Sequence, residues 1–139
     1  MSTMETSLID DPPAIVITIV GEADMAAILA LLPAEIGEPR RSNVIWDLTD
    51  ASLSTMSPGA VLDIAREAAA QSERRPEPRT VFITRDPIIG KMTGLLRENV
   101  ARMGGTTRFR IAPDREIAIA WLRGDPGVVD TGTHIRPDT

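Results

Sequence analysis

Short runs of β-branched, apolar residues alternate with amphipathic segments along this chain, and the alternation limits the folds open to it. The longest run, Ala14–Val20, is almost wholly apolar, as expected of a strand covered on both faces. The other runs are Val44–Leu48, Thr80–Thr84 and Thr107–Ile111. This strand–helix order predicts parallel strands joined by right-handed crossovers.

Helix-start signals follow these runs. Ser57-Pro58 and Asp86-Pro87 each place a capping residue before a proline at the first helical position. Asp24 is expected to cap a further helix, over residues 24–36, and the segment 114–122 predicts a last short one.

An additional strand at Thr6–Ile9 is expected to form a hairpin with the first long run. The sequence therefore predicts an α/β fold, a mixed sheet of about five strands with about four helices packed on it. Phe82 and Trp121 are expected in the core, and the aliphatic residues from Ile88 to Met103 are expected to form one helix face.

The chain has 139 residues, a length that suits one domain. Residues 1–123 are expected to form it, and residues 124–139, with frequent Gly and Pro and no apolar period, are expected to be a flexible tail. The chain starts without a basic, apolar leader and has no apolar run near the roughly 20 residues of a membrane span, so a cytoplasmic protein is expected.

The composition argues against several functions. The chain has no Cys and one His, which leaves few residues for nucleophilic, redox or zinc chemistry, so we expect no enzyme activity, no cofactor and no metal. A net charge of −5 with 3% aromatic residues also argues against nucleic-acid binding. Asp24, Asp47, Asp50 and Asp86 could in principle hold a hard cation, although each suits a turn or a cap equally well.

Three segments resemble the STAS domain family, and within it the SpoIIAA-like relatives of anti-sigma-factor antagonists. They are Gly21-Glu22-Ala23-Asp24 between a strand and a helix, Asp47-Leu48-Thr49 at the end of the next strand, and Ala118-Ile119-Ala120-Trp121-Leu122 in the last helix. The resemblance covers most of residues 14–123 and implies a mixed sheet with helices and a regulatory role in protein interaction, as in bacterial signalling.

The resemblance also indicates candidate site residues. Ser57 aligns with the phospho-acceptor of the antagonists, but Thr55-Met56-Ser57-Pro58 stands where they have Asp-Ser-Ser-Gly. Ser57 can therefore be a phospho-acceptor or only a helix cap. With Thr55, Asp24 and Asp50 it forms the candidate surface for a partner or a phosphate, at the carboxyl ends of the parallel strands.

The sequence favours a non-catalytic regulatory module that docks to another protein, and leaves a homodimer open. The alternative is a carrier of a small apolar, lipid-like ligand, lined by the Ile88–Met103 stripe.

Overall fold

The strands lie in one sheet, in the order in which they occur along the chain. The computed structural model describes residues 3–10, 13–23, 27–28, 43–52, 57–72 and 79–124. Its five-stranded sheet has the order β1-β2-β3-β4-β5. The strands are β1 (Thr3–Asp10), β2 (Pro13–Glu22), β3 (Asn43–Ser52), β4 (Arg79–Ile83) and β5 (Arg108–Ala112).

Strands β1 and β2 form the expected hairpin, and the other neighbours are parallel. The hairpin pairs residues continuously from Thr3 opposite Val20 to Asp10 opposite Pro13. From β2 to β5 each strand runs parallel to the next, with one irregularity between Thr18 and Val20. The predicted mixed α/β sheet is confirmed.

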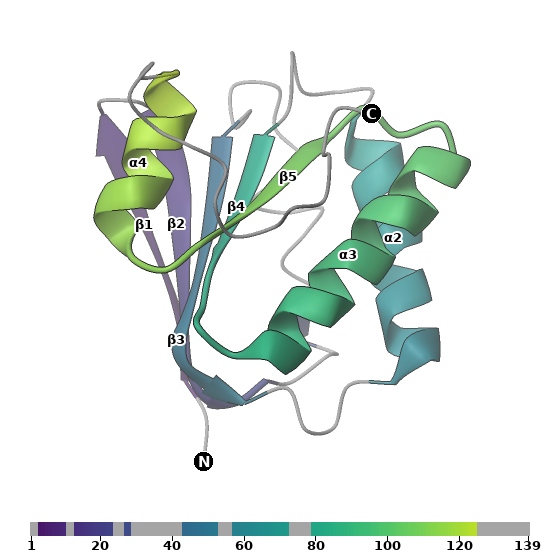
Figure 1. Ribbon diagram of the computed structural model, residues 1–139, viewed down its shortest axis with the longest axis horizontal. Helices are drawn as coiled ribbons and strands as arrows, with labels where there is room; N and C mark the ends of the chain where they lie inside the picture. The colour runs from purple at the N-terminus through teal and green to yellow at the C-terminus, as the bar shows by residue number, and fades with distance from the viewer. Residues whose placement is uncertain are drawn as a thin grey trace.

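Helices cover both faces of this sheet. Figure 1 shows α4 (Arg115–Arg123) on one face and α2 (Pro58–Ser72) with α3 (Pro87–Arg102) on the other. Of the fourth expected helix, residues 24–36, only Ala27 and Ile28 lie among the described residues, and both are helical. The expected tail also lies outside them, apart from Gly124.

Alternate residues of β2 enter two different parts of the core, as the strand period requires. Ile15, Ile17 and Ile19 join the cluster on one face, and Ala14 and Val16 join the cluster under α4 on the other. All five side chains are buried. The expectation that this run is covered on both faces is confirmed.

Three aromatic rings form a row across β3, β4 and β5. The ring centroid of Phe82 lies 6.5 Å from that of Trp46 and 6.2 Å from that of Phe109, and both pairs are stacked. Phe82 contacts two core clusters yet is only partly buried, and so is Trp121. Both were expected in the core; they pack against its clusters but are not fully buried.

The aliphatic stripe on α3 is divided between core and solvent. Ile89, Leu96 and Val100 are buried, whereas Ile88 is 61% exposed and Leu95 and Met103 are exposed as well. The expectation of a single buried face was too broad. Leu96 and Val100 pack with residues of α2 and β5 on one side of the helix, and Ile89 joins a second core cluster.

Strand β3 is longer than its apolar run predicted. It continues beyond Leu48 to Ser52, and Asp50, Ala51 and Ser52 pair with the end of β2. The expected polar loop therefore begins later. Thr49, Asp50 and Ser52 are exposed, which removes the apolar signal while backbone pairing continues.

Replacing either of two glycines with alanine should change the free energy of unfolding, in opposite directions. Gly104 has φ of +82°, a left-handed conformation, so Gly104→Ala should lower the free energy of unfolding by about 1 kcal/mol. Gly59 lies in the first turn of α2 with only Ser57 Oγ near the added methyl, at 3.8 Å, so Gly59→Ala should raise it by about 0.5 kcal/mol. Urea denaturation of both variants measures this, and equal effects would contradict these backbone conformations.

Candidate functional site

The candidate site lies at the edge where the parallel strands end. In Figure 1 the carboxyl ends of β3 and β4 point toward the same side of the molecule as the start of α3. Open α/β sheets gather ligands and partners at this edge because the loops there are free to carry polar groups. The candidate residues that the structure describes belong to this edge.

Ser57 is the cap of α2, as its sequence context predicted. Its Oγ accepts a hydrogen bond from the backbone N–H of Ala60 at 3.1 Å, and its carbonyl oxygen accepts one from Val61 at 3.0 Å. The residue is exposed. A phosphate on this hydroxyl would stand at a helix N-terminus but would displace the cap bond.

Asp50 is exposed in the last part of β3, opposite Val20 of β2. In the described part of the chain no hydrogen bond or ion pair connects Asp50 with Ser57. The other two candidates, Asp24 and Thr55, lie outside the described residues. The structure thus places two of the four candidates on one sheet edge without a direct bond between them.

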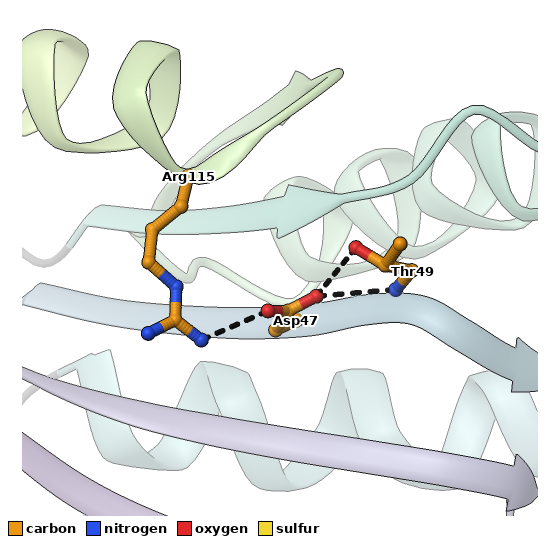
Figure 2. Close-up of polar contacts among 3 residues, drawn as sticks. All are labelled: Asp47, Thr49 and Arg115. Carbon is orange, nitrogen blue, oxygen red and sulfur yellow. Dashed lines mark hydrogen bonds and ion pairs between the residues drawn. The ribbon is translucent and has the colours of Figure 1, made fainter.

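A polar cluster in β3 is the feature that sequence reasoning did not assemble. Figure 2 shows Asp47 between Thr49 and Arg115. One carboxylate oxygen, Oδ1, accepts from the backbone N–H of Thr49 at 3.2 Å and from its hydroxyl at 2.7 Å. The other, Oδ2, accepts from the Arg115 guanidinium at 2.9 Å. The cluster ties the start of α4 to the middle of the sheet.

These contacts decide the charge of Asp47. Burial raises the pKa of its carboxyl, but the hydrogen bonds from Thr49 and Arg115 and the positive charge of Arg115 outweigh burial, so the pKa lies below its ordinary value. Asp47 is thus a carboxylate at neutral pH. The only sequence signal was a lone acid within an apolar strand, and its partner stands 68 residues further along the chain.

Two further acids accept hydrogen bonds from backbone N–H groups at helix starts. Asp86 accepts from the N–H of Ile88 at 2.9 Å and caps α3, and Asp114 accepts from Ile117 at 2.9 Å and caps α4. Among the described residues no group of three His, Cys, Asp or Glu could hold a metal ion. Of the four acids considered for a cation, Asp47 and Asp86 have structural partners. Among the described residues no hydrogen bond to Asp50 is observed, and Asp24 lies outside them.

Comparison with known proteins identifies the fold. No family model and no curated protein matches the sequence. Among solved structures, an anti-sigma factor antagonist from Mycobacterium paratuberculosis is similar, with a TM-score of 0.60 and 16% identity over 88% of this chain and 95% of that one. An uncharacterized protein with a SpoIIAA-like fold from Shewanella loihica PV-4 has a TM-score of 0.53 and 18% identity over 87% of this chain and 93% of that one. This chain therefore has the SpoIIAA-like fold that its STAS resemblance predicted.

The described residues contain no helix long and apolar enough to cross a membrane.

Proposed function

We propose that this protein is a non-catalytic regulatory module that docks to a partner protein through the carboxyl edge of its parallel strands, around Asp50 and Ser57. The observation that carries the proposal is the fold, shared along most of its length with a protein described as an anti-sigma factor antagonist. The two exposed polar residues at that edge support it, because polar rims surround protein interfaces.

The structure also bears on the alternative of an apolar-ligand carrier. That alternative depended on the α3 stripe as a pocket lining. Two of its buried members, Leu96 and Val100, pack directly with Val61, Ala65 and Phe109. They fill the core there, and this favours the docking module over the carrier.

A capture experiment in the host organism tests the proposal. Wild-type protein, Asp50→Arg and the matched control Glu116→Arg, an exposed acid at the start of α4, serve as baits. We expect one protein to be recovered with the wild type and the control but not with Asp50→Arg. Equal recovery with all three baits, or an apolar ligand retained in native mass spectrometry, would contradict the proposal.

Within this module we propose that Ser57 acts as a cap and not as a phosphorylation switch. Ser57→Ala should then lower the free energy of unfolding by about 1 kcal/mol, while Ser57→Asp, which can also cap, should change it little. Binding of the captured partner should be the same for wild type and Ser57→Asp. Phosphate detected on Ser57 in protein from the host, with partner binding weakened about tenfold by Ser57→Asp, would show a switch instead.

A further inference from the structure

The two edge strands of the sheet differ in how they are protected against pairing. The edge strand β5 has five residues, two of them arginines, and Ile111 lies close to α3 at Gly90, 3.6 Å from the position of an added methyl. Charged residues and covering elements are the usual protection of a sheet edge. Strand β5 is therefore protected against pairing with a further strand.

Strand β1 also carries two charged residues, Glu5 and Asp10, but it lacks the other kinds of protection among the described residues. It is eight residues long and pairs with β2 without a shift in register, so no bulge bends it away. It contains no proline or lysine, and no strand of the described chain pairs with its outer edge. Leu8 is 61% exposed on it. A long, regular edge with an exposed leucine is available for pairing with another strand.

We infer that β1 pairs antiparallel with β1 of a second copy of this chain, about a two-fold axis at Thr6, to make one sheet continuous through both subunits. The inference is independent of the proposed function. The pairing uses the outer edge of β1, whereas the proposed docking surface lies around Asp50 and Ser57. Self-pairing is favoured by the order of side chains along β1.

A two-fold axis perpendicular to the sheet requires that residues opposite each other point to the same face. With the axis at Thr6, Met4 lies opposite the partner's Leu8. Met4 packs against the core cluster on its face, so this pair would extend an existing apolar surface. With the axis at Ser7 instead, Met4 would lie opposite the partner's Asp10. Of these two registers, the side-chain pattern favours the axis at Thr6.

The charged residues of β1 are compatible with the same register, but they limit the affinity of the dimer. Glu5 lies opposite the partner's Ser7, so no carboxylate directly faces another. The two copies of Glu5 are diagonal neighbours, about 7–8 Å apart, and repel each other modestly. A strand edge also buries much less surface than a standard interface. We therefore expect a weak dimer that added salt tightens.

Sedimentation velocity from low micromolar to near-millimolar protein tests the pairing. Wild type should dimerise as concentration rises, and Leu8→Lys should weaken the dimer about tenfold through the loss of two symmetric contacts. Glu5→Thr should tighten it about threefold by removing the diagonal repulsion. Ile88→Lys is the matched control, because Ile88 has the same 61% exposure on α3. A monomer at every concentration, or a dimer lost in Ile88→Lys but kept in Leu8→Lys, would overturn the inference.

The register has its own test, because the chain has no native cysteine. The Thr6→Cys variant places two thiols opposite each other across the axis, within reach of a disulfide, and should cross-link on mild oxidation. Ser7→Cys is the control, because Ser7 faces the partner's Glu5. Faster cross-linking at position 7 than at position 6 would overturn the axis at Thr6.

Discussion

Replacing Phe82 with alanine should lower the free energy of unfolding by about 3 kcal/mol. Phe82 lies between Trp46 and Phe109 in the aromatic row and contacts two of the core clusters, although the residue is only partly buried. Its loss would remove the apolar surface of the ring and both stacking contacts. Chemical denaturation followed by Trp fluorescence measures the change, since Trp46 is adjacent to the ring.

Two controls separate this role from a general effect of substitution. Phe82→Leu keeps most of the apolar volume but not the stacking and should cost about 1 kcal/mol. Ile88→Ala, at an exposed position, should change stability by less than about 0.5 kcal/mol. If Phe82→Ala were as stable as Ile88→Ala, the aromatic row would not contribute to the fold.

The elements that could be predicted from the sequence are those with a local signal. The strand Ala14–Val20 and the caps at Ser57 and Asp86 were found where the residues indicated, because apolar runs and cap hydrogen bonds depend on neighbouring residues. The polar end of β3 was missed. Its pairing is made by the backbone with β2, and side chains on a solvent-facing edge do not report it.

The candidate site was predicted less completely, for a related reason. The sequence indicated the edge and the residues Asp50 and Ser57, but gave Asp47 no partner: it was placed in a hypothetical cation site and in the STAS-like end of its strand. Its actual partner, Arg115, comes from another element, and nothing local to either residue shows that α4 begins over β3. The division of the α3 stripe is also tertiary, because it depends on where α2 and β5 contact the helix.

Replacing Asp47 with alanine should lower the free energy of unfolding by about 2 kcal/mol at neutral pH. The substitution removes three hydrogen bonds, one of them with a charged guanidinium, at a side chain that is only 16% exposed. Arg115 is 48% exposed and remains solvated, which keeps the loss below that of a fully buried ion pair. Urea denaturation measures the difference.

The pH dependence of stability shows whether the charge of Asp47 is responsible. Its pKa is lower in the folded state than in the unfolded chain, so its contribution is complete above the unfolded value, about 3.9, and is lost as the pH falls through the lower folded value. Asp47→Asn keeps an oxygen acceptor for Thr49 but not the charge. It should cost about 1 kcal/mol at neutral pH and lose less stability than the wild type on acidification.

Asp63→Asn is the matched control for this comparison, since Asp63 forms an exposed ion pair with Arg66 on α2 and should contribute less than about 0.5 kcal/mol. Its acid unfolding should follow that of the wild type. If Asp47→Asn and wild type lost stability in parallel between neutral pH and pH of about 3, the ion pair with Arg115 would contribute nothing to the fold. The attachment of α4 to the sheet would then depend on its apolar contacts alone, chiefly those of Ala118 and Leu122.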